Sequence, residues 1–225
     1  MEIIDKEIEK LKIKYEVEEY RHALAILKND FKEELLEILE ILNSFELLAS
    51  DILEPGGRKS PISEKIDSVF YSKGWKEVEF DTVISLQKKE YEKDSTKAQL
   101  GEIEEYKTPT HKIDCFKNRI AFEIEWNNKT EFYDRDLNNF RLLFDLNVVS
   151  VGIILTRSTK LDKIFKELEN EFKEKNPKAK SKLINKYGAS STHMDKLIPR
   201  IEGRSAGGCP LLIIGISEKT YKYDL

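Results

Sequence analysis

The chain has 225 residues, of which 36% are charged and 40% hydrophobic, and its formal net charge is −4 at pH 7. A chain of this length can bury one sizeable core, and no Pro/Gly/Ser-rich linker divides it, so we expect a single domain over residues 1–225. The slightly negative net charge excludes a protein whose whole surface is basic. Any DNA binding therefore requires a local basic face.

Cysteine content and the N-terminal segment narrow the class of protein. Cys115 and Cys209 are the only cysteines and form no CxxC pair, which excludes a disulfide framework and favours two small buried hydrophobic residues. Residues 1–20 alternate charged with apolar side chains, unlike a signal peptide or a membrane-spanning helix. We therefore expect a cytoplasmic protein with no membrane partner.

The first third of the chain predicts a strand followed by helices. Residues 11–18, LKIKYEVE, alternate apolar and polar side chains, as in a strand with one buried face. Apolar residues from Phe31 to Leu42 recur at helical spacing, with Asn29 or Asp30 as the expected N-cap.

A glycine-containing loop at residues 54–61, EPGGRKSP, precedes the next expected helix. Ser60 followed by a proline suits an N-cap and a first helical turn, so a helix is predicted from Pro61 to about Ser72, ending at Gly74. Residues 75–86, WKEVEFDTVISL, then predict a strand.

The middle of the chain predicts an irregular segment and then a hairpin. Residues 87–109 are polar and weakly periodic, and we expect a mobile excursion that orders only against a partner. Residues 111–116, HKIDCF, and 118–126, NRIAFEIEW, predict two strands joined by a tight turn at Lys117-Asn118.

The remaining elements complete an α/β pattern. Helices are predicted over 136–146 and around 161–168, and buried strands over 148–155 and 211–216. The expected fold class is therefore α/β, with a central mixed β-sheet flanked by helices.

Three acidic residues, Asp114, Glu123 and Glu125, fall on the predicted hairpin. Residues two apart in a strand point to the same face, so Glu123 and Glu125 project together, and Asp114 is expected near Glu123. A divalent cation would relieve the repulsion among them. Oxygen ligands with no His or Cys beside them favour Mg²⁺, or Mn²⁺ as a substitute, over zinc.

Such an ion suits phosphodiester hydrolysis, because it helps deprotonate water and offsets charge on the phosphate and the leaving oxygen. The alternative interpretation is that the three acids are ordinary solvated carboxylates in a glutamate-rich chain.

Residues 111–137, HKIDCFKNRIAFEIEWNNKTEFYDRDL, resemble the active-site segment of the type II restriction endonucleases of the BamHI, BglII and BstYI group, BstYI most of all. This group lies within the PD-(D/E)xK nuclease fold. The resemblance extends to residues 59–77, 145–156 and 198–216. It implies a homodimer that cuts both strands of a short palindromic double-stranded DNA site, with GATC-type sites suggested.

The resemblance also implies roles for single residues. Asp114 and Glu123 would bind the metal, and Glu125 would stand where most members of the fold carry a lysine that helps activate water. Glu or Gln at that place is typical of this group. Glu64, on the helix after Pro61, is a candidate accessory carboxylate, with a solvated helix-face residue as its alternative.

Candidate DNA-binding residues fall in three polar segments, chosen because basic and amide side chains contact phosphates and base edges. They are Arg58, Lys59 and Ser60 at a helix N-terminus; Asn127, Asn128, Lys129 and Arg135 after the acidic strand; and His193, Lys196, Arg200 and Arg204 before the last strand.

Two other functions remain open from the sequence. One is a repair or recombination nuclease of the same fold that recognises DNA structure, and the other is a DNA-binding module whose acids are only structural. For the homodimer, the helix over 136–146 is the candidate interface, although its apolar stripe would look the same if it packed on the sheet.

Overall fold

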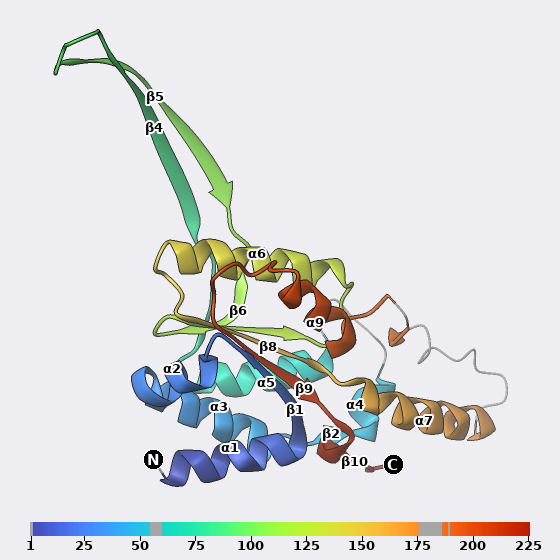
Figure 1. Ribbon diagram of the computed structural model, residues 1–225. Coiled ribbons are helices and arrows are strands. Elements are labelled where there is room, and N and C mark those ends of the chain that lie inside the picture. Colours follow the sequence, from blue (N-terminus) through green and yellow to red (C-terminus); the bar gives the residue numbers. More distant parts are fainter. Residues whose placement is uncertain (1, 55–59, 176–185, 189) are drawn as a thin grey trace.

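The computed structural model describes residues 2–54, 60–175, 186–188 and 190–225. A six-stranded sheet forms the centre of the body (Figure 1). In spatial order its strands are β1 (Tyr15–Tyr20), β9 (Leu211–Ile216), β8 (Val151–Arg157), β7 (Ile120–Glu125), β6 (Ile113–Lys117) and β3 (Lys76–Val78). Strands β7, β8 and β9 are parallel and the other pairings are antiparallel, so the sheet is mixed, as expected.

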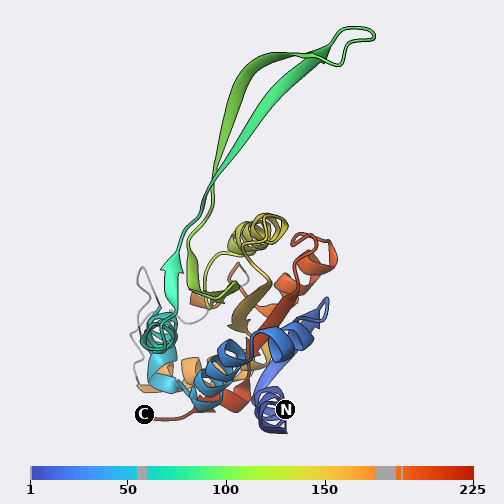
Figure 2. The same cartoon turned by 90° about the vertical axis from the view of Figure 1, so that its left-hand side faces the viewer.

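Helices cover both faces of this sheet and bury two separate apolar clusters (Figures 1 and 2). On one face lie α1 (Glu2–Lys14), α2 (Ala23–Asp30), α3 (Lys32–Ser44), α4 (Ala49–Leu53), α5 (Pro61–Ser72) and α7 (Asp162–Lys175). On the other face lie α6 (Glu131–Asp145) and α9 (Met194–Glu202). The expected α/β class, a mixed sheet flanked by helices, is confirmed.

Short elements complete the described part of the chain. Strands β2 (Leu47–Leu48) and β10 (Tyr221–Lys222) pair in parallel, and two 3₁₀ turns span Thr159–Leu161 and Glu218–Thr220. Among the described residues, none of the helices combines the length and the apolar character that a bilayer crossing requires.

Strand β7 is buried along its whole length because both of its faces are covered. Phe122 and Ile124 belong to the cluster beneath α3 and α5, whereas Ala121 belongs to the cluster beneath α6. The period-two alternation of a strand therefore assigns Glu123 and Glu125 to the α6 face.

The N-terminal prediction was wrong in part, because residues 11–14 are helical and the strand begins only at Tyr15. Ile4, Ile8 and Leu11 recur at helical spacing and are buried, whereas Ile13 is 75% exposed. The apolar-polar alternation therefore combines the end of an amphipathic helix with the start of β1.

The cap predicted for the next helix was also wrong. Asn29 and Asp30 end α2, and α3 begins at Lys32 after Phe31, which provides no side-chain cap. The helical spacing itself is confirmed, since the apolar residues of α3 are buried.

The helix predicted after the glycine loop is confirmed at both ends. Ser60 Oγ accepts a hydrogen bond from the Ser63 amide at 3.0 Å, and Pro61 occupies the first turn. Gly74 follows with a φ of 85°, a backbone conformation that favours glycine.

The predicted 111–126 hairpin is confirmed, with its turn one residue later than expected. Asn118 and Arg119 adopt positive φ values of 43° and 69°, as in a two-residue turn between twisted strands. Cys115 pairs with Phe122, which places Asp114 next to Glu123.

Strands β4 (Asp81–Tyr91) and β5 (Ala98–Pro109) form a two-stranded antiparallel ribbon that projects from the body (Figures 1 and 2). The excursion predicted over 87–109 therefore contains regular strands, which its weak periodicity does not indicate. The strand predicted over 75–86 divides between β3 and β4. Neighbouring Val83 and Ile84 are both about half exposed, at 51% and 49%. Because apolar side chains occupy both faces of the ribbon, its sequence lacks the one-sided pattern of a packed strand.

We expect the body to fold without the ribbon. Replacing residues 83–107 by Asn-Gly, between the paired Thr82 and Thr108, should change the Tm measured by circular dichroism by less than about 4 °C. The reason is that the ribbon side chains are mostly exposed and an isolated two-stranded hairpin contributes little stability in water. A much larger loss of Tm would show that the ribbon stabilises the body.

Candidate active site

As the sequence predicts, Glu123 and Glu125 share one face of β7, and the structure shows that α6 covers this face. Both residues are almost fully buried, with 1% and 2% of their surface exposed. A strand that is buried on both faces leaves these carboxylates no bulk water, so the surrounding protein groups decide their state.

Asp114 and Glu123 are joined by two reciprocal contacts. The Asp114 amide donates to Glu123 Oε2 at 3.2 Å, and the Ile124 amide donates to Asp114 Oδ2 at 2.9 Å. The β6–β7 hairpin thus holds two of the predicted carboxylates against one another through its own backbone, and the expected proximity is confirmed.

The structure adds two residues that the sequence interpretation missed, His111 and Asp136. Asp136 extends from α6 and is fully buried. One ligand atom from each of His111, Glu123 and Asp136 lies within 4.8 Å of the others. The expectation that no histidine accompanies the acids was therefore wrong.

Signals for both missed residues were present in the sequence. His111 comes three residues before Asp114, and Asp136 begins the predicted 136–146 helix at helical spacing from Phe140 and Leu143. Neither spacing shows that the side chain points at β7.

Burial and mutual repulsion shift the pKa values of the acids upward. Burial, and then the Asp136 and Asp114 carboxylates, raise the pKa of Glu123 well above its ordinary value. Burial and Asp136 raise the pKa of Glu125 to about 9, and burial raises that of Asp136 to about 6 against the opposing pull of Arg135. Without a cation, part of the cluster is therefore protonated at neutral pH.

Two residues predicted to contact DNA, Arg135 and Asn128, also contact these carboxylates. Arg135 donates to Asp136 Oδ1 from Nε at 3.0 Å and from Nη2 at 2.9 Å. Its Nη2 also lies 3.7 Å from Glu125 Oε1, and Asn128 donates to Glu125 Oε2 at 2.8 Å. Arg135 supplies the positive charge that limits repulsion in the cluster.

The described residues fit a divalent cation. Glu123 Oε1 and Asp136 Oδ2 are buried without a hydrogen-bond partner among the described residues. The Glu125 and Asp136 carboxyls also contact one another. Buried carboxylate oxygens without donors are costly unless a cation or a proton compensates them. Carboxylate oxygens are also the ligands that Mg²⁺ and Mn²⁺ prefer.

The segments on either side of the site lie against one another. Lys129 forms a β-bridge with Ser191, and the Thr192 amide donates to the Asn128 carbonyl at 2.9 Å. His193 then precedes α9 as its N-cap residue. The chain after β7 and the chain before α9 therefore form one surface beside Glu125.

Other candidates follow along α9. Lys196 Nζ lies 3.4 Å from the Ser191 carbonyl, close to this surface, and Arg200 forms an ion pair with Asp134 on α6. Arg204 lies instead in a small hollow with Tyr20 and Arg21, at the opposite end of the sheet from Glu125. The structure thus separates Arg204 from the other candidates.

Of the remaining candidates, the structure describes Ser60, Asn127 and Glu64. Arg58 and Lys59 lie outside the described residues, and Ser60 caps α5. Asn127 is half-buried beside Asn128, and Glu64 is exposed on α5, the solvated position considered as its alternative.

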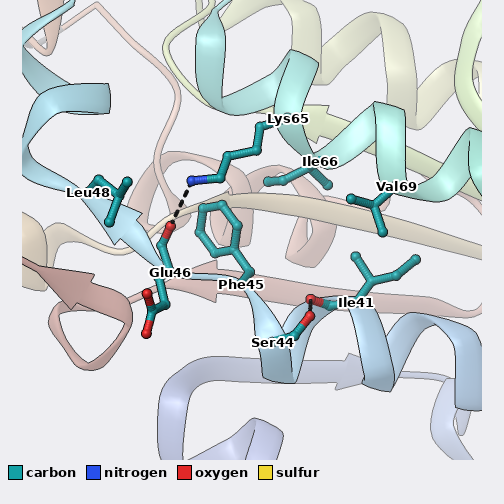
Figure 3. Close-up of a pocket in the computed structure, with 8 residues that line it drawn as sticks. All are labelled: Ile41, Ser44, Phe45, Glu46, Leu48, Lys65, Ile66 and Val69. Atoms are coloured by element: carbon teal, nitrogen blue, oxygen red, sulfur yellow. Dashed lines mark hydrogen bonds between the residues drawn. The ribbon is translucent and has the colours of Figure 1, made fainter.

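A surface cavity of about 220 Å³ between α3 and α5 is not a rival site (Figure 3). Its walls are mainly apolar, and Lys65 is its one basic side chain. That amine already lies 3.2 Å from Asp51 and 3.5 Å from the Glu46 carbonyl. The cavity therefore offers no converging set of acids like the one on β7.

Comparison with known proteins identifies the family. Residues 15–216 match the family described as restriction endonuclease BglII/BglIII. No curated protein matches the chain. Because the match spans most of the sequence, the chain belongs to the BglII restriction endonuclease family, and it is a type II restriction endonuclease. Enzymes of this family are nucleases that act on DNA.

The stability of the metal-free protein should depend on pH through Glu125. Its pKa rises from 4.5 to about 9 on folding, so the folded chain binds this proton more tightly than the unfolded chain. Stability conferred by the proton is present below about pH 4.5 and is lost as the pH rises toward 9. Glu125→Gln should reduce this loss by on the order of 1 kcal/mol or more.

Urea unfolding in EDTA at several pH values would measure this effect. Glu33→Gln, at an exposed position of α3 on the other face of the sheet, is the matched control and should follow the wild type. Parallel pH curves for wild type and Glu125→Gln would contradict the electrostatic picture of the site.

Proposed function

We propose that the protein recognises a short palindromic double-stranded DNA site and hydrolyses one phosphodiester in each strand, with Mg²⁺ as cofactor and Mn²⁺ as a substitute. The observation that carries the proposal is the Asp114–Glu123 pair, locked by two backbone hydrogen bonds in a chain of a restriction endonuclease family. A solvated surface carboxylate would need neither these backbone hydrogen bonds nor a buried partner such as Glu123.

In this proposal Asp114 and Glu123 hold the cation, which when bound lowers the pKa of water and offsets charge on the phosphate. Once a bound cation lowers its raised pKa, Glu125 would assist by accepting a proton from the attacking water or by holding a cation. Asn128 and Arg135 keep the Glu125 carboxyl pointed into the cluster through the contacts at 2.8 and 3.7 Å. Preorganised groups of this kind need no rearrangement as the reaction proceeds.

The DNA would lie along the surface where residues 127–130 meet residues 190–196. Lys129 is exposed there, and Lys196 and His193 are partly exposed nearby. This local basic surface supports phosphate binding by a chain whose formal net charge is −4. It adjoins Glu125 through Asn128, so bound phosphates would lie beside the acids.

Cutting both strands of a palindrome requires two active sites related by a twofold axis, so we propose a homodimer. The apolar stripe of α6 does not serve this purpose, because Tyr133, Leu137, Phe140 and Leu143 are buried against the sheet. Any contact through α6 would use its outer, polar face. The nearer likeness to BstYI and a GATC-type site remain predictions from the sequence resemblance.

Asp114→Asn should reduce cleavage of phage DNA in Mg²⁺ by about a thousandfold, because it removes a charge from the proposed cation site. Gel electrophoresis would measure the discrete fragments, and a gel shift in Ca²⁺ or EDTA should show retained DNA binding. Glu33→Gln is the control and should cut normally. Undiminished cutting by Asp114→Asn would overturn the site, and a smear in place of fragments would indicate a structure-directed nuclease.

Lys129→Ala and Arg204→Asn provide a matched pair of charge removals for DNA binding. Lys129→Ala should weaken binding and lower the slope of log affinity against log salt by about 1, as the loss of one phosphate contact predicts. Arg204→Asn should leave both unchanged, because Arg204 lies at the other end of the sheet. Equal effects of the two changes in fluorescence anisotropy would contradict the proposed DNA surface.

A further inference from the structure

The space between β7 and α6 has a second set of ligands beyond the Asp114–Glu123 pair. His111, Glu123 and Asp136 each offer one atom, and these atoms lie within 4.8 Å of one another. Asp136 comes from the helix layer and His111 from the chain entering β6, so the set converges from three separate elements. Residues so distant in sequence meet only through the fold.

The two oxygens of Glu123 have different surroundings. Oε2 accepts the Asp114 amide, whereas Oε1 is buried without a donor among the described residues. In Asp136, Oδ1 accepts from Arg135 and Oδ2 has no partner among the described residues, while the carboxyl also contacts that of Glu125. Each carboxylate thus keeps one buried oxygen available, which is costly unless a cation satisfies it.

The backbone of His111 is tied to the helix that carries Asp136. Asn139 of α6 donates to the His111 carbonyl at 3.1 Å. One imidazole nitrogen of His111 lies within 4.8 Å of the ligand oxygens of Glu123 and Asp136. Imidazole nitrogen is a common ligand of transition metal ions.

We propose that His111, Glu123 and Asp136 form a second cation position, on the α6 side of Glu123, that prefers a divalent transition ion such as Mn²⁺ to Mg²⁺. The single imidazole nitrogen sets this preference, because Mg²⁺ favours oxygen ligands whereas first-row transition ions accept nitrogen readily. Glu123 is shared with the position beside Asp114. The proposal deepens the proposed function, but metal binding in the absence of DNA tests it separately.

The test is electron spin-echo spectroscopy of the full-length protein loaded with Mn²⁺, without DNA. The wild type should show nitrogen modulation from a directly bound imidazole, and His111→Gln should abolish it. The same substitution should weaken Mn²⁺ binding by about tenfold or more in an EPR titration. Asp136→Asn should weaken Mn²⁺ binding similarly although it leaves all three histidines in place.

His22→Asn is the matched control, because His22 is exposed at the start of α2 and its φ of 60° suits asparagine. This variant should keep the nitrogen signal. The absence of nitrogen modulation from the wild type would overturn the proposal, and so would its persistence in His111→Gln. Loss of DNA cleavage in Asp114→Asn concerns the other position, so the two proposals can fail independently.

Discussion

The structure depends on one constraint, which is that β7 is buried on both faces and yet carries two glutamates. Phe122 and Ile124 satisfy one face by packing under α3 and α5. On the other face, Glu123 and Glu125 must lose their hydration, and burying an uncompensated carboxylate costs several kcal/mol. The polar groups gathered around this face are the response to that cost.

Helix α6 supplies a positive charge that stabilises the buried carboxylates, and it also adds a further buried carboxylate to them. Its Arg135 places a positive charge between Asp136 and Glu125, whereas Asp136 itself adds another buried carboxylate. A fold selected for stability alone would place an apolar residue at position 136. An acid at this position fits the proposed cation site. Ionisable groups with strongly shifted pKa values concentrate at functional sites.

The proposed DNA surface depends on tertiary pairing in a similar way. Lys129 and Ser191 are far apart in the sequence, and their β-bridge brings the chain after β7 against the chain before α9. Glu123 and Glu125 sit on β7, which has a neighbouring strand on either side, so this surface is fixed to the interior of the sheet. The β4–β5 ribbon, by contrast, projects beyond the body with apolar side chains on both faces.

The sequence alone determined the elements with a strong local pattern and the three acids of the hairpin. Strand β9, helix α5 with its Ser60 cap and the shared face of Glu123 and Glu125 follow from spacing and capping, which are local properties. Only the tertiary structure decided that Asp136 and His111 join the acids and that Arg204 does not lie with the other basic residues. These placements depend on how α6 and α9 pack across the sheet, and one-dimensional spacing does not record the direction of that packing.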